Sequence, residues 1–292
     1  MLVTMKQILD KVNEGNYAVP APNIFSEIDA RACVEAAEDM NSPLILGIAY
    51  PTTNDLRFTA GIATALAAQA KVPVAVHLDH GANLGQVAQA IRAGMTSVMY
   101  DGSSLPTDEN IANVRKVVEM ASPLGISVEA EIGHVGQGAE YDQAAGGLTD
   151  PEEAKMFIEE TGVDACAVAI GTAHGAYSGT PHLDFDRLAA IKEMTGIPLV
   201  LHGSSGTGEE NIRKVCRLGI NKVNVCNDIL RTVYEELKQA DMKGNDVYDL
   251  WPFVAEKVRN FVKRQIDITG SEGKAWEVKV SGLPRGVVTM RE

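Results

Sequence analysis

The chain has 292 residues, enough for one large domain or two small ones, and its hydrophobic content of 45% with only 5% aromatic residues predicts a globular core of Ala, Val, Ile and Leu. A net charge of −13 without a lysine or arginine run argues against a nucleic-acid partner. The absence of a basic leader and of any apolar run of about 18 residues disfavours secretion and a membrane span, and four widely spaced cysteines are typical of reduced thiols in a cytoplasmic protein.

Short apolar segments rich in Val and Ile alternate along the chain with longer segments of helical periodicity. Helix start signals follow several of them, such as Ser26 before Glu27 and Asp150 before Pro151. Alternation of this regularity favours a parallel sheet closed into a single (β/α)8 TIM barrel. Eight strands are predicted, over residues 18–24, 44–49, 72–78, 97–100, 127–132, 165–170, 199–201 and 222–225.

No linker divides the chain. Residues 1–292 are therefore predicted to form one domain. Residues 246–292 are predicted to be a C-terminal helical extension and tail, with the clearest helical periodicity over 248–268.

Histidines collect where barrel enzymes carry their chemistry, at the carboxyl ends of the strands. One such histidine is as often a structural or solvated residue as a ligand, but several from different strands favour a metal site. Three imidazoles with an open fourth position are typical of catalytic zinc, and His80, His174 and His202 are the strongest candidates. All six histidines follow this pattern: His77, His80, His134, His174, His182 and His202.

Strand alternation places His77 and Asp79 on the same face, so Asp79 is predicted to point into the barrel mouth and to transfer a proton. His77 is predicted to support the site from behind the ligands. The glycine-rich loop 203–208 and the segment 224–228 follow the seventh and eighth strands, where barrels usually bind phosphate.

These motifs together resemble the class II, metal-dependent fructose-bisphosphate and tagatose-bisphosphate aldolase family, over residues 1 to about 274. The resemblance implies that Asp79 of His77-Leu78-Asp79-His80-Gly81 is the acid/base residue. It makes His80, His174 and His202 zinc ligands, and Glu131 a carboxylate that can approach the metal. The positions implied for binding substrate or its phosphate are Asn23, Gly175, Gly203, Ser205, Asn224 and Asn227.

Such an enzyme would cleave a ketose phosphate by a retro-aldol reaction to dihydroxyacetone phosphate and an aldehyde. Glu140, in the loop after the fifth strand, is the candidate that protonates the remaining fragment, and a solvated loop residue is the alternative. The implied cofactor is Zn²⁺, with another divalent cation as the alternative and a monovalent cation as an assistant. A homodimer or homotetramer is expected.

Three departures from the family pattern bear on the substrate. Ala49 replaces a frequent serine, and Cys226-Asn227-Asp228 replaces a segment that ends Thr-Asp or Thr-Glu. Trp251 stands where bisphosphate aldolases have an arginine that holds the far phosphate. The substrate is therefore predicted to be a ketose 1-phosphate or a modified sugar. A misaligned segment, or replacement of the arginine by Arg285 or Arg291, is the alternative.

Other functions compete with this one. A Schiff-base aldolase would use a barrel lysine such as Lys222 and would leave the three histidines unexplained. A metal-dependent sugar-phosphate isomerase or epimerase could use the same ligands without releasing a triose. A sugar-phosphate-binding protein without turnover is the third alternative, and the presence of Asp79 argues against it.

Overall fold

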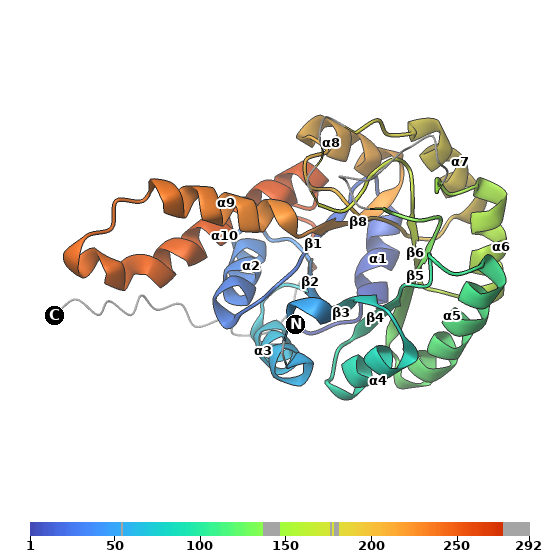
Figure 1. Cartoon of the computed structure of the whole chain (residues 1–292), viewed down its shortest axis with the longest axis horizontal. Helices are drawn as coiled ribbons and strands as arrows, with labels where there is room; N and C mark the ends of the chain where they lie inside the picture. Colours follow the sequence, from blue (N-terminus) through green and yellow to red (C-terminus); the bar gives the residue numbers. More distant parts are fainter. Residues whose placement is uncertain (54, 137–146, 176, 178–180, 277–292) are drawn as a thin grey trace.

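Eight parallel strands form a closed barrel with helices around it (Figure 1), which confirms the predicted fold class. The computed structural model describes residues 1–53, 55–136, 147–175, 177 and 181–276. Neighbouring strands pair in the order β1-β8-β7-β6-β5-β4-β3-β2, and a bridge between Asn23 and Gly47 joins the two ends. The strands are β1 (Val19–Pro22), β2 (Leu44–Ala49), β3 (Val74–Gly81), β4 (Ser97–Tyr100), β5 (Ser127–Ile132), β6 (Ala165–Val168), β7 (Leu199–Leu201) and β8 (Ile220–Val225).

Helices connect the strands, and local sequence signals explain where they begin. Ser26 caps α2 through a reciprocal capping box with Asp29, and Asp150 caps α6 one residue before Pro151. The helices are α1 (Met5–Asn13), α2 (Glu27–Asp39), α3 (Leu56–Gln69), α4 (Leu84–Arg92), α5 (Thr107–Ala121), α6 (Pro151–Thr161), α7 (Phe185–Thr195), α8 (Glu209–Leu218), α9 (Asn227–Gln239) and α10 (Leu250–Thr269).

The N-terminal helix α1 closes one end of the barrel, and the sequence analysis did not predict it. Thr4 and Gln7 form its capping box. Its buried face packs against the inward side chains of five strands in a small apolar cluster that includes Ala21, Ala75 and Ala167. These small side chains leave room inside the barrel for the helix. The amino ends of the strands are thereby sealed, and the opposite end remains for the site.

Strand boundaries differ from the predicted ones where other groups take the backbone hydrogen bonds. The prediction for β6 ran to residue 170, but the Ala169 N–H donates to Thr149 Oγ1 at 2.8 Å and leaves the ladder. The prediction for β1 began at residue 18, but the Ala18 N–H donates to the carbonyl of Thr269. The strand β3 instead continues to Gly81, beyond its predicted end.

The C-terminal helices α9 and α10 project from the barrel as a pair (Figure 1). The part of α10 nearer the barrel packs against α2 and buries Val258, Val262 and Ile266. Ion pairs Arg259–Glu35 and Lys263–Asp39 reinforce this contact. Helix α10 is therefore held against α2 by both apolar and charged contacts.

A core substitution tests the packing between helices and strands. Phe157 on α6 is fully buried, and Phe157→Ala is expected to lower the free energy of unfolding by about 3–5 kcal/mol because a cavity replaces the ring. Phe58 is 68% exposed, and Phe58→Ala is expected to change the free energy of unfolding by less than about 0.5 kcal/mol. Urea unfolding of both variants measures the difference; equal losses would contradict the packing described.

Candidate metal centre

Asp79 and His80 are consecutive residues that both face the barrel mouth, which regular alternation along a strand does not allow. From Leu78 to Gly81 β3 advances three residues while β4 advances two, from Val98 to Tyr100, so β3 carries a bulge there. The backbone of His80 has φ 51°, in the left-handed region that residues other than glycine rarely adopt. The bulge thus turns His80 inward beside Asp79.

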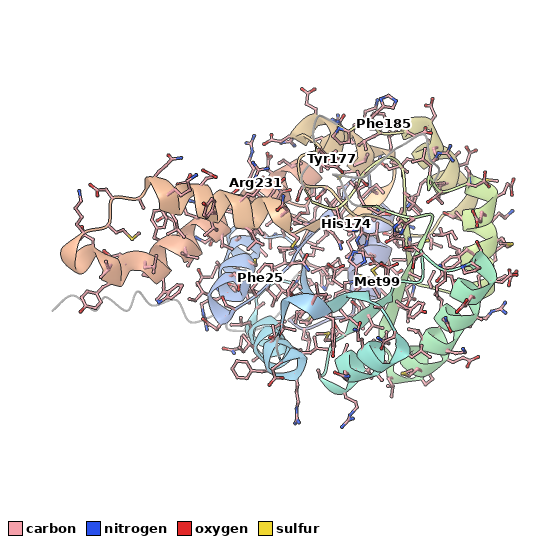
Figure 2. All side chains as sticks on the ribbon, in the orientation of Figure 1. Phe25, Met99, His174, Tyr177, Phe185 and Arg231 are labelled. Atoms are coloured by element: carbon pink, nitrogen blue, oxygen red, sulfur yellow. The ribbon has the colours of Figure 1, made fainter. Side chains whose placement is uncertain are left out.

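The three histidines predicted as ligands come together from β3, the loop after β6 and the end of β7. Their ring centroids lie 4.8 Å apart for His80 and His174, 4.5 Å for His80 and His202, and 5.9 Å for His174 and His202. One nitrogen from each ring lies within 4.8 Å of the others. Figure 2 shows His174 in the region enclosed by the strands.

Two of these rings are oriented by carboxylates. His80 Nδ1 lies 2.8 Å from Asp101 Oδ2, and Asp101 is itself held by Ser103, whose Oγ donates to Oδ1 at 2.8 Å. His202 Nε2 lies 3.0 Å from Glu129 Oε1. A carboxylate on one ring nitrogen leaves the other nitrogen available to a metal.

These residues fit a divalent metal. The Nε2 atom of His80 is buried and has no hydrogen-bond partner among the described residues. A zinc ion bound by three imidazoles at about 2.1 Å needs their nitrogens close together in this manner. Burial lowers the pKa of His174 to about 4 and that of His202 well below its usual range, so both rings are neutral, as metal ligands must be.

The pKa of His80 moves the other way. Burial would lower it, but the charge of Asp79, the hydrogen bond that His80 donates to Asp101, and the charges of Glu131 and Asp101 outweigh burial and raise the pKa to about 9. The His80 ring is therefore protonated on both nitrogens at neutral pH in the metal-free protein, and a metal must displace one of these protons.

Glu131 and Asp101 bring two further carboxylates next to His80, and their oxygens form a second group with it within 4.8 Å. Glu131 Oε1 accepts the Val135 N–H at 2.9 Å, while Oε2 is buried without a hydrogen-bond partner among the described residues. Burial, followed by the charge of Asp101, raises the pKa of Glu131 to about 8. Sequence reasoning missed Asp101, although it directly follows Tyr100, the last residue of β4.

Asp79 is held by the two asparagines that were predicted to lie near the substrate. Asn23 Nδ2 donates to Oδ2 at 2.9 Å, and Asn224 Nδ2 donates to Oδ1 at 2.8 Å. Burial would raise the pKa of Asp79, but His80, His202, Lys222 and the Asn23 hydrogen bond outweigh burial and lower it to about 2. The carboxylate is therefore ionised at neutral pH, with His80 Nε2 4.0 Å from Oδ1.

The predicted phosphate-binding residues lie at the carboxyl ends of β6, β7 and β8. Gly203 has φ 65°, and a side chain there would collide with the carbonyl of Ala173. Ser205 Oγ accepts the Asp228 N–H at 3.2 Å, and Asn227 is the first residue of α9. Gly175 follows the ligand His174, with φ 86°. The loops after β7 and β8 border a groove of about 640 Å³ that also includes Arg231 and Arg264.

Three other residues considered in the sequence analysis, His77, Lys222 and His134, are not among the clustered ligands. His77 is fully buried, with Nδ1 2.6 Å from Ser97 Oγ. Lys222, the Schiff-base alternative, is also fully buried, and its Nζ lies 2.7 Å from Glu129 Oε2. His134 is exposed, and its Nδ1 is hydrogen-bonded to Ser103 Oγ at 3.0 Å. Glu140 lies outside the described residues.

Comparisons with known proteins found one matching family model and similar solved structures. The family model of class-II fructose-bisphosphate aldolase matches residues 3–274. The crystal structure of the YdjI aldolase from Escherichia coli K12 is 30% identical, with a TM-score of 0.85, and the match covers 94% of this chain and 100% of that one. The fructose-bisphosphate aldolase Fba from Campylobacter jejuni, 22% identical, shares the fold with a TM-score of 0.77 over 94% of this chain and 97% of that one.

Within the described part of the chain, no helix has the length and apolar character needed to cross a membrane.

The match over nearly the whole chain favours an aldolase over the isomerase, the non-catalytic binding protein and the Schiff-base enzyme. The chain belongs to the class II fructose-bisphosphate aldolase family and is a class II aldolase, a carbon–carbon lyase that releases an aldehyde.

Proposed function

We propose that this aldolase uses zinc and cleaves a ketose phosphate to dihydroxyacetone phosphate and an aldehyde. The observation that carries the proposal is the convergence of His80, His174 and His202, whose ligand nitrogens lie within 4.8 Å of one another. The buried Asp79 carboxylate lies beside them, with Oδ1 4.0 Å from His80 Nε2. Three imidazole ligands and a separate proton acceptor are the parts that a metal-assisted carbon–carbon cleavage requires.

When bound by these histidines, zinc would act as a Lewis acid that polarises the ketose carbonyl. Asp79 would accept the proton of the hydroxyl on the carbon that becomes the aldehyde, and Asn23 and Asn224 would keep its oxygens directed at that hydroxyl. The carbon–carbon bond then breaks, and its electron pair stays on the three-carbon fragment. Glu140 remains the proposed donor of the proton that this fragment takes up on carbon.

The phosphate of the substrate would bind against Gly175, Gly203 and Ser205, beside the amino end of α9 at Asn227. Backbone N–H groups in glycine loops and at helix starts attract anions without needing a lysine-rich surface. This explains how a chain with a net charge of −13 could bind a sugar phosphate.

We propose further that the substrate is a ketose 1-phosphate or a modified sugar and not the usual bisphosphate. Trp251, at the family's arginine position, is the second residue of α10 and is 61% exposed. Helix α10 begins at the end of the helix pair that lies away from the barrel (Figure 1). An indole cannot make the paired, charge-assisted hydrogen bonds that a guanidinium makes to phosphate. Arg285 and Arg291 lie outside the described residues.

A homodimer or homotetramer, and the separate role of residues 246–292 as an extension and tail, stay predictions. The same is true of an assisting monovalent cation.

Removal of one ligand tests the metal centre. We expect His174→Ala to lose zinc and cleavage activity, because two imidazoles hold the ion much more weakly than three. The exposed His182, which is not among the clustered histidines, provides the control: His182→Ala should keep both. Zinc content after gel filtration and release of dihydroxyacetone phosphate with and without chelator are the measurements. Activity that survives chelation would refute the metal mechanism.

Replacement of the proposed base separates chemistry from metal binding. Asp79→Asn keeps the size of the side chain but removes the basic carboxylate, so kcat should fall by about 10²- to 10⁴-fold. Zinc content should stay at the wild-type level, because Asp79 is not one of the clustered ligands. Retained kcat in a zinc-loaded Asp79→Asn protein would show that another group accepts the proton.

The substrate proposal is tested with fructose 1-phosphate, fructose 1,6-bisphosphate and tagatose 1,6-bisphosphate. We expect wild type to prefer the monophosphate. Trp251→Arg should raise kcat/KM for a bisphosphate by about 10- to 100-fold if the guanidinium restores a charged hydrogen bond. Tyr248→Arg places the same charge on a nearby exposed aromatic position and should not raise kcat/KM for a bisphosphate. A wild-type preference for either bisphosphate would contradict the proposal.

A further inference from the structure

Below the three histidines, Lys222 of β8 and Glu129 of β5 form an ion pair in the interior of the barrel. Their Nζ and Oε2 atoms are 2.7 Å apart, and both side chains have 0% exposure. Taking two charges out of water is costly, and a buried pair is often no more stabilising than apolar residues of similar volume. Stability alone therefore does not account for the pair.

The two oxygens of Glu129 face different partners. Oε2 receives Lys222 Nζ and lies 3.6 Å from His77 Nε2, whereas Oε1 lies 3.0 Å from His202 Nε2. A carboxylate can only accept a hydrogen bond, so Oε1 requires the proton of His202 to be on Nε2. In the neutral ring, Nδ1 then carries a lone pair.

The Nδ1 atom of His202 lies on the side of the ring that faces Asn224. Asn224 Nδ2 lies 3.2 Å from it and 2.8 Å from Asp79 Oδ1, which places Nδ1 on the same side as the proposed base. Glu129 therefore holds the Nε2 side of His202, and a metal at Nδ1 would take the place of the contact with Asn224 Nδ2. Glu129 in turn depends on Lys222, because His77 is the other group near Oε2 and its distance is too long for a good hydrogen bond.

We propose that Lys222 is a positioning residue for the metal centre. By holding Oε2 it keeps Oε1 of Glu129 on His202 Nε2, and this contact fixes the His202 tautomer and ring orientation in which Nδ1 would be the atom that holds a metal. The inference rests on the proposed zinc centre but concerns residues that do not touch the ion. It also assigns a role in orienting a ligand to a buried lysine that does not itself transfer a proton in the proposed cleavage.

The first test measures zinc affinity with a chromophoric chelator as competitor. Lys222→Met should bind zinc about 10- to 100-fold more weakly, the usual effect of losing a partner behind a metal ligand. The control is Lys192→Met. Lys192 is partly buried, and it donates to Asn221 Oδ1 and the Ile197 carbonyl near the amino ends of β8 and β7. Its removal should leave zinc affinity unchanged, and unchanged affinity in Lys222→Met would overturn the proposal.

Two double variants keep the test valid if Lys222→Met does not fold. Glu129→Gln with Lys222→Met removes both charges but retains a side-chain carbonyl that can accept from His202 Nε2. Glu129→Leu with Lys222→Met removes both charges and the acceptor. We expect the first to recover most of the zinc affinity and the second to remain weak, whereas equal affinities would overturn the proposal.

A second readout does not need the metal. Nitrogen-15 spectra of the histidine rings in the metal-free protein should show His202 protonated on Nε2 in wild type and in the glutamine double variant. The leucine double variant should show a mixture of tautomers, and an unchanged tautomer there would overturn the proposal. Failure of wild type to bind zinc would instead refute the proposed centre, and the spectra would still decide whether Glu129 and Lys222 orient His202.

Discussion

The alternation of side chains along parallel strands is the constraint on which the rest of this molecule depends. Every second residue of each strand points into a closed barrel, where polar groups must find partners because water does not reach them. At the α1 end the inward side chains are small and apolar, such as Ala75 and Ala165. Nearer the mouth they are His77, Glu129 and Lys222, all fully buried. The site is therefore built on a polar layer above an apolar one.

That polar layer explains how the ligands are oriented. His202 is held from below by Glu129, and His80 is held from the side by Asp101, so two carboxylates from neighbouring strands each direct one imidazole. Groups fixed in this manner need little reorganisation when a metal or substrate binds. The negative charges also stay behind the histidines, which leaves the open side of the cluster for the substrate.

One departure from regular strand geometry makes the centre possible. Without the bulge in β3, Asp79 and His80 would face opposite sides of the barrel wall. The left-handed backbone of His80 costs on the order of 1–3 kcal/mol, and its hydrogen bond to Asp101 helps to maintain it. Sheet pairing, the bulge and the second carboxylate therefore act together to bring a proposed base and a proposed metal ligand next to each other from consecutive positions.

The sequence by itself determined the barrel, most strand positions and the residue types at the mouth, because strand periodicity and helix caps are local properties. It also placed His77 and Asp79 on one face by parity, and it selected the three histidines that meet. Tertiary structure alone decided that Asp101 orients His80, that α1 closes the barrel, and that Lys222 is paired with Glu129 and not free as a nucleophile. Those contacts join different elements of the chain, 93 residues apart for Lys222 and Glu129, so they depend on the register between strands and on closure of the barrel, which no local pattern encodes.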